Sequence, residues 1–266
     1  MFSRLFDFYI HSSLHVSFAI LALAIVTYYM FGIPTDNSVL LFVFSSSLIG
    51  YNFTKYNALL LSKNASTERK AIFILSVICS VLAIYSFLKL ELASKEITLL
   101  TGFFTLLYIL PFYKGKNFRN SSATKIYIVA LCWVLSTLIL PLAQAGYAID
   151  VDVLIKCAQR FTLVIILILI FEIIDLKEDK PELRTVPQSI GVRNTKIVGV
   201  LLLVVFLVLE FALTNFKLSQ LYINVILAIT TLVFTLLADE KKSKYYTTFW
   251  VESIPILWLV LVIFFR

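Results

Sequence analysis

Long apolar stretches alternate with shorter polar segments from one end of the chain to the other. Each stretch has about 20 residues, which is the length that an α-helix needs to cross about 30 Å of hydrocarbon. The pattern predicts an all-α polytopic membrane protein with nine transmembrane helices, at residues 10–31, 38–61, 71–90, 96–113, 124–147, 153–174, 195–214, 218–238 and 247–265. Nothing resembles a soluble second domain, so residues 1–266 are predicted to form a single transmembrane domain.

The composition supports this prediction. Hydrophobic side chains make up 60% of the 266 residues and charged ones only 15%, whereas a soluble domain has about 25% charged residues. In a soluble protein, the net charge of +7 would suggest nucleic acid as a partner. In a membrane protein the charges are interpreted by location, and no nucleic-acid partner is predicted.

The basic residues determine the predicted orientation. Most of the 23 Lys and Arg residues fall in the N-terminal segment and in the loops after predicted helices two, four, six and eight. Positive residues favour the cytoplasmic side, so these segments are predicted to be cytoplasmic and Arg266 external. The expected location is a bacterial inner (plasma) membrane, with membrane lipid around the helices.

The sixth apolar stretch ends in a dense group of charges. If the helix continues past the membrane surface, Glu172, Asp175 and Asp179 follow at i, i+3 and i+7 and lie on one face of it. Like charges repel at this spacing, so a cation is expected to neutralise them, and Mg²⁺ prefers carboxylate oxygens. The alternative is a solvated helix end whose acids pair with Lys177 and Lys180.

This segment resembles a known family. Asp175-Leu-Lys-Glu-Asp179, followed by Arg184-Thr-Val-Pro187 and Ile190-Gly191, resembles the second aspartate-rich motif of the UbiA superfamily of membrane prenyltransferases. The resemblance implies nine transmembrane helices and two such motifs at the cytoplasmic surface, which hold Mg²⁺ and a polyprenyl diphosphate.

A second similarity lies between predicted helices four and five. Tyr108-Ile-Leu-Pro111, followed by Lys114, Lys116, Arg119 and Lys125, resembles a basic segment that the family carries between the same two helices. The alternative is an ordinary basic membrane anchor.

The first aspartate-rich motif of the family is not matched. The corresponding place reads Gly50-Tyr-Asn-Phe-Thr-Lys-Tyr-Asn-Ala-Leu59, and no Asp or Glu lies between Asp36 and Glu68. We therefore expect a hybrid site, in which the second motif holds Mg²⁺, Lys55 pairs with a diphosphate oxygen, and Asn52 donates a hydrogen bond. The alternative is that Lys55 only reaches the lipid headgroups.

The resemblance implies a prenyltransferase that moves an isoprenoid chain from a polyprenyl diphosphate to an aromatic or other lipophilic acceptor with Mg²⁺. The expected site residues are Asp175, Asp179 and Lys55 for catalysis, Glu172, Asp175 and Asp179 for the metal, and Asn52, Lys114, Lys116, Arg119 and Arg184 for the diphosphate. The alternative function is a catalytically inactive UbiA-like protein that binds a lipid, a quinone or a partner protein. A transporter would place ionisable residues in mid-membrane, where Glu210 and Glu252 are the candidates.

Overall fold

The structure is a computed structural model that describes residues 2–60, 66–109 and 124–265. These residues form helices and short connections without any strand, so the all-α prediction is confirmed. The helices are α1 (Phe2–His11), α2 (Leu14–Phe31), α3 (Asn37–Leu60), α4 (Thr67–Leu88), α5 (Leu92–Ile109), α6 (Thr124–Val134), α7 (Leu140–Gln144), α8 (Val151–Ile174), α9 (Val186–Val208), α10 (Leu218–Leu237) and α11 (Ile254–Phe264). Two π-helical segments, Leu135–Ile139 and Tyr246–Val251, continue into α7 and α11, and short 3-10 turns cover Asp175–Lys177, Pro181–Leu183 and Leu209–Ala212.

Eight helical segments of the described chain are long and apolar enough to cross a membrane. They contain α2, α4, α5, α6 with α7, α8, α9, α10 and α11. α3 is not among the eight although it has 24 residues, because polar side chains such as Asn52, Thr54 and Lys55 interrupt its second half. The chain is thus an integral multi-pass membrane protein, and the predicted count of nine spans stays a prediction.

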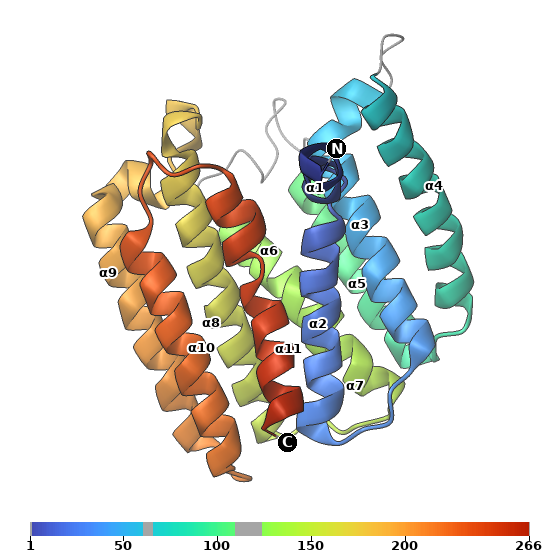
Figure 1. Cartoon of the computed structure of the whole chain (residues 1–266). Helices are drawn as coiled ribbons and strands as arrows, with labels where there is room; N and C mark the ends of the chain where they lie inside the picture. The colour runs from blue at the N-terminus through green and yellow to red at the C-terminus, as the bar shows by residue number, and fades with distance from the viewer. Residues whose placement is uncertain (1, 61–65, 110–123, 266) are drawn as a thin grey trace.

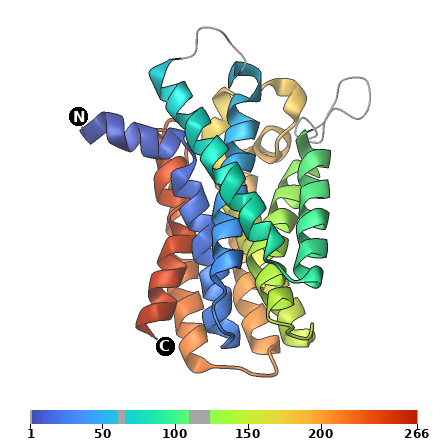
Figure 2. The ribbon, with the colours of Figure 1, turned by 90° about the vertical axis from the view of Figure 1, so that its right-hand side faces the viewer.

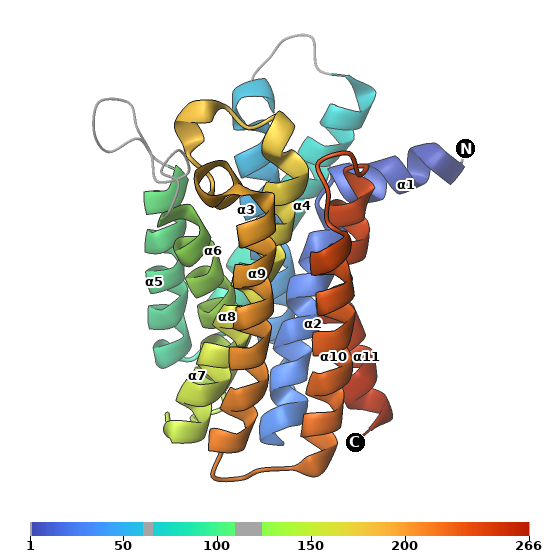
Figure 3. The same cartoon turned by 90° about the vertical axis from the view of Figure 1, so that its left-hand side faces the viewer.

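The long helices run side by side, with α2 and α8 in the middle of the bundle (Figure 1). α2 packs against α3 and α11, and α8 packs against α6 and α9, so both halves of the chain meet there. α1 lies across one end of the bundle and projects sideways from it (Figures 2 and 3). We call this end the α1 end; the C-terminus lies at the opposite end.

Apolar side chains fill the core and also cover the outside of the bundle. α8 is buried along most of its length, for example at Leu163 and Ile166. Large apolar side chains of α4, α5 and α9 are exposed, for example Ile84, Leu99 and Leu201. Exposed apolar faces of this kind are expected where helices contact lipid rather than water.

The first predicted span, residues 10–31, begins too early. The structure breaks the helix at Ser12 and Ser13, and Ser13 has a left-handed backbone with a φ of 61°. The preceding helix, α1, is not part of the span: its Phe6 packs against Tyr245 and Phe249, with ring centroids 5.5 and 5.1 Å apart. α1 is therefore held against the segment that leads into α11. Of the two helices in the predicted span, α2 alone runs along the bundle.

Pro141 has no N–H to donate, and the helix that contains it is irregular just before the proline. The carbonyl of Thr137 lies four residues before Pro141 and has no helical N–H to accept, and the π-helical segment Leu135–Ile139 is found there. Thr27 Oγ1 of α2 and Arg160 of α8 both donate to this carbonyl oxygen at 2.7 Å. Neighbouring helices thus satisfy the freed group, which makes a proline tolerable inside a membrane helix.

Candidate active site

The carboxylates of the second motif meet through a tight turn at the α1 end. α8 ends at Ile174, and residues 175–177 form a 3-10 turn in which the N–H of Asp179 donates to the carbonyl of Asp175 at 2.9 Å. The expectation that one helix face carries all three acids was wrong, because Asp179 has already left the helix. The turn still keeps Asp175 and Asp179 close enough for their charges to repel each other.

Glu172 differs from the two aspartates because it is buried, with only 3% of its surface exposed. Its Oε1 forms an ion pair with Lys125 Nζ of α6 at 2.9 Å. Its Oε2 accepts the N–H of Val186 at 3.0 Å, which is one of the N–H groups left without a helical partner at the start of α9. Glu172 therefore ties α6, α8 and α9 together below the aspartates, and its role as a direct metal ligand stays a prediction.

The cations near the aspartates come from other elements than expected. Lys177 pairs with Glu240 at 3.4 Å and so does not pair with the acids of its own motif. Lys244 forms an ion pair with Glu178 at 2.5 Å and also acts on the charge of Asp175. The pairing of Lys177 with the acids of the motif, which the simple alternative predicted, is therefore not found, and no ion pair of Lys180 with them is seen in the described part of the chain.

Lys125 is the other cation that acts on the aspartates. It pairs with Glu172, and its charge reaches both Asp175 and Asp179. The sequence places it in the basic segment after the fourth predicted span. The structure shows that this lysine opens α6 and lies beside the second motif.

The two aspartates are in a setting that favours a bound cation. Burial raises the pKa of Asp179; Lys125 opposes this shift and Glu178 adds to it. Both acids follow the C-terminus of α8, where the helix dipole places partial negative charge. A hydrogen bond to Glu178 raises the pKa of Lys244, which therefore stays charged beside them.

This donor set fits Mg²⁺ that is shared with a substrate. Within residues 2–60, 66–109 and 124–265, no group of three or more His, Cys, Asp and Glu side chains forms a metal site. Asp175 and Asp179 supply two carboxylates, and Mg²⁺ is commonly held by one or two carboxylates together with water and phosphate oxygens. The residues fit an ion bridged to a diphosphate, not a cage made by protein alone.

Asn52 and Lys55 lie on α3, in the place of the unmatched first motif. Asn52 is buried, and its Nδ2 donates to Ser76 Oγ of α4 at 3.0 Å, while its Oδ1 meets no hydrogen-bond donor in the described chain. Lys55 is exposed, and its charge interacts with that of Glu252, just before α11. The structure thus directs Asn52 toward α4 and gives Lys55 a carboxylate neighbour.

The remaining predicted diphosphate residues are placed only in part. Arg184 is exposed after the turn Pro181–Leu183, with a left-handed backbone whose φ is 43°, and its carbonyl accepts the hydroxyl of Ser189. Lys114, Lys116 and Arg119 lie outside the described residues. Their contribution to a diphosphate site therefore stays a prediction.

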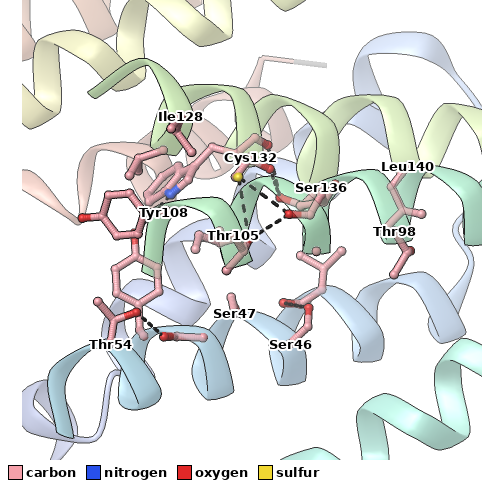
Figure 4. A pocket seen from close by; sticks show the side chains of 18 of the residues that line it. Ser46, Ser47, Thr54, Thr98, Thr105, Tyr108, Ile128, Cys132, Ser136 and Leu140 are labelled. Carbon is pink, nitrogen blue, oxygen red and sulfur yellow. Dashed lines mark hydrogen bonds between the residues drawn. The ribbon is translucent and has the colours of Figure 1, made fainter. Parts of the chain in front are cut away.

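A cavity of about 440 Å³ lies between α3 on one side and α5 and α6 on the other. None of the described residues that line it carries a charge. Many of its hydroxyls bond within the wall; Ser136, for example, donates to the carbonyl of Cys132 at 2.7 Å, and the hydroxyl of Thr105 lies 3.7 Å from Cys132 Sγ (Figure 4). With these hydroxyls occupied, the cavity offers a largely apolar surface.

The cavity reaches toward the acidic turn. Tyr51, Thr54 and Tyr108 line it near the α1 end, where the hydroxyl of Tyr51 accepts Trp133 Nε1 at 3.1 Å. On α6, Ile128 lies one turn beyond Lys125 and also lines the cavity. Lys125, which pairs with Glu172 of the second motif, therefore lies one helical turn from the wall of the cavity.

Solved structures show which fold this is. The chain matches a UbiA homolog from Archaeoglobus fulgidus bound to GPP and Mg²⁺ with a TM-score of 0.68 and 13% identity, over 97% of this chain and 98% of that one. The same homolog bound to DMAPP and Mg²⁺ gives the same values. The chain has the UbiA fold. A structure of digeranylgeranylglyceryl phosphate synthase also matches, with a TM-score of 0.59 and 14% identity over 98% of both chains.

The UbiA resemblance drawn from the motifs is thus confirmed for the fold, which is that of membrane prenyltransferases. The sequence itself matches no family model and no curated protein. In this UbiA-like bundle the sequence pointed to Glu172, Asp175 and Asp179, but not to the partnership of Lys125 with Glu172 or of Glu252 with Lys55. No sequence signal marks either pair, because the partners are far apart in the chain.

Proposed function

We propose that the chain is a membrane prenyltransferase that transfers an isoprenoid chain from a polyprenyl diphosphate to an aromatic or other lipophilic acceptor with Mg²⁺. The observation that carries this proposal is the pair Asp175 and Asp179, placed beside Lys125, which lies one helical turn from the wall of an uncharged cavity of about 440 Å³. A charged end and an apolar interior match the two halves of a prenyl diphosphate. The UbiA fold and the GPP and DMAPP complexes of the Archaeoglobus homolog support it.

The proposed chemistry separates charge at the mouth of the cavity. The bond between the allylic carbon and the diphosphate oxygen breaks, and its electron pair leaves with the diphosphate. The acceptor supplies the electron pair of the new bond to the allylic carbon and then loses a proton to water. Bound Mg²⁺ would neutralise the charge that grows on this leaving group. Asp175 and Asp179 would hold the ion, with Glu172 fixing the end of α8 on which they sit.

The protein's own cations and cavity complete the proposal. Lys55 and Arg184 would pair with diphosphate oxygens, together with Lys114, Lys116 and Arg119 of the basic segment. The cavity would hold the isoprenoid chain and the acceptor and exclude water, which would otherwise capture the allylic cation.

We also propose that the α1 end faces the cytoplasm, that residues 1–266 act as one domain, and that the membrane is a bacterial inner membrane. Lys125, Lys177 and Lys244 lie at this end, and positive residues favour the cytoplasmic side. The diphosphate would then be taken from the cytoplasm.

A second candidate function is a UbiA-like protein that binds a lipid or a quinone without turnover. One observation favours it: Lys55 stands where the family carries a carboxylate, and Asn52 is bonded to Ser76. A cation at that position repels a second metal ion. This candidate predicts occupancy of the cavity without release of diphosphate.

The experiment that separates the two uses the full chain purified into phosphatidylcholine nanodiscs. Geranyl diphosphate is added with lipophilic phenols, with Mg²⁺ or with EDTA, and released diphosphate and prenylated product are measured. The transferase requires release that depends on both Mg²⁺ and an acceptor. Saturable binding without release supports the second candidate, and the absence of both contradicts each of them.

A further inference from the structure

A second pocket lies at the opposite end of the bundle from the acidic turn. It has a volume of about 390 Å³, and its walls come from the ends of α2, α8, α10 and α11 and from the connection at residues 213–217. The ends of these helices meet near the C-terminus (Figure 1). Unlike the central cavity, this pocket is lined by charged and amide side chains, among them Lys156, Glu210 and Asn215.

Glu210 and Lys156 form a buried ion pair in the wall of this pocket. Lys156 Nζ lies 2.7 Å from Glu210 Oε2, and the two residues are 8% and 0% exposed. Gln159 and Asn224 donate to the same carboxylate oxygen, at 2.9 and 2.7 Å. Three donors therefore converge on Oε2, while Glu210 Oε1 has no hydrogen-bond partner within the described chain.

An unsatisfied buried carboxylate oxygen calls for a hydrogen-bond donor. Lys156 has three N–H groups and bonds to Glu210 through one of them. An acceptor without a partner and spare donors therefore lie side by side in the wall of the pocket. A group that both donates and accepts satisfies the two at once, and a hydroxyl is such a group.

The charged residues that line the pocket are balanced in number, which favours a neutral ligand over an ion. Asp152 and Glu210 balance Lys156 and Lys217 among its lining residues. Asp152 is already occupied, because it accepts four hydrogen bonds from Thr214 and Asn215, at 2.8 to 3.1 Å. These bonds hold the loop at residues 213–217 against α8.

The charged residues around Glu210 also disfavour a charged ligand. A ligand cation next to Glu210 would be repelled by Lys156 and by Arg160, whose charge acts on Lys156. A ligand anion would be repelled by Glu210 and Asp152. A neutral ligand rich in hydroxyl groups is repelled by neither the basic nor the acidic side chains.

Aromatic side chains supply the rest of the wall. Phe31 and Tyr147 pack edge to face, with ring centroids 5.3 Å apart, and both line the pocket together with Tyr29 and Phe265. Flat apolar faces beside amide and carboxylate groups suit a ring that carries hydroxyls on its edge and C–H groups on its face. A pocket with mixed walls of this kind can orient such a ligand through a few polar contacts.

We propose that this pocket is a binding site for a neutral polyhydroxylated ligand, either a free sugar or polyol or the sugar head of a glycolipid. A hydroxyl of the ligand donates to Glu210 Oε1 and accepts from Lys156 Nζ. Asn215 and Gln220 bond to further hydroxyls, and the aromatic rings cover the apolar face. The site is separate from the proposed active site, and under the proposed orientation it opens to the exterior.

The test uses the full chain in phosphatidylcholine nanodiscs, which contain no sugar. Radiolabelled glucose, galactose, inositol and glycerol are titrated by equilibrium dialysis, and a second preparation contains glucosyl diacylglycerol, whose retention is counted by native mass spectrometry. Saturable binding of a free polyol supports a soluble ligand, and selective retention of the glycolipid supports a lipid head. If no probe binds or is retained, the pocket holds water only and the proposal is overturned.

Substitutions of the lining residues show whether the binding that is measured occurs in this pocket. The double variant Lys156→Met, Glu210→Gln keeps the charge balance and should weaken binding at least tenfold, and Tyr147→Leu, which leaves the ion pair intact, should weaken it as well. The matched control is Thr230→Val on α10, outside both pockets, which should bind as the natural chain does. Thermal unfolding in nanodiscs reports that each variant is folded. Unchanged polyol binding in both pocket variants would contradict the proposal.

Discussion

At the residue scale, the acids of the second motif have different surroundings, and these suggest different roles. Glu172 is buried, forms an ion pair with Lys125 and accepts the N–H of Val186. Among the described residues, Asp175 and Asp179 take part in no ion pair, although Lys125 is close enough to act on both. We therefore expect Glu172 to act mainly in holding the site together and the aspartates to act on the ligand.

The role of Glu172 can be tested through stability. Glu172→Gln removes the charge that pairs with Lys125 and should destabilise the protein by about 1.5 to 3 kcal/mol, the range for a hydrogen bond to a charged group. The double variant Glu172→Gln, Lys125→Met should lose less than the sum of the two single losses, because the pair is removed together. Thermal unfolding in nanodiscs measures this coupling, and strict additivity would show that the pair does not contribute.

Lys55 separates the hybrid site from a simple membrane anchor. If it pairs with a diphosphate oxygen, Lys55→Met should weaken geranyl diphosphate binding about tenfold, which corresponds to about 1.4 kcal/mol. Lys70→Met changes another exposed lysine at the α1 end and is the matched control. Equal affinities of the two variants would leave Lys55 as an anchor in the headgroups.

At the element scale, breaks in the helices bring distant polar groups together. α8 ends where the acids begin, and the π-helical segment before α7 exposes the carbonyl of Thr137 to α2 and α8. Sequence spacing predicted the acids. It ended the sixth span at residue 174, where α8 ends, but it did not predict the 3-10 turn that follows, because the apolar pattern carries no information on this turn.

The satisfied carbonyl of Thr137 yields a prediction for the packing of these helices. Thr27→Val keeps the shape of the side chain and removes its hydrogen bond, so it should destabilise the protein by about 1 to 3 kcal/mol. Pro141→Ala restores an N–H that can bond to the same carbonyl, so the loss in the double variant should be smaller. Thermal unfolding checks this, with Thr230→Val on α10 as the control. An equal loss with and without the proline would contradict the explanation.

At the scale of the whole molecule, the sequence predicted the architecture and only part of the interior. Apolar stretches placed most of the helices within a few residues, since burying an apolar helix in lipid depends on local composition. Pairs such as Lys125 with Glu172, or Lys156 with Glu210, join residues about 50 positions apart. Contacts of this kind depend on how the helices pack, which hydrophobic periodicity alone does not specify.

The orientation of the bundle is testable by labelling. In a background without the three native cysteines, a cysteine placed at Glu178 or Lys244 should react with an impermeant maleimide only after the membrane is opened. A cysteine at Asn215 or Lys217 should react in intact cells, because it lies at the opposite end. The reverse pattern would overturn the proposed orientation, and cytoplasmic access to the acids with it.

The most direct test of the central claim is the Mg²⁺-dependent affinity of the purified chain for geranyl diphosphate. Asp175→Asn and Asp179→Asn keep the size of each side chain and remove its charge, and Glu240→Gln is the control at the same end. We predict that each aspartate variant loses at least tenfold of the Mg²⁺-dependent affinity, about 1.4 kcal/mol, while the control keeps it. Unchanged Mg²⁺-dependent affinity in both aspartate variants would contradict the account.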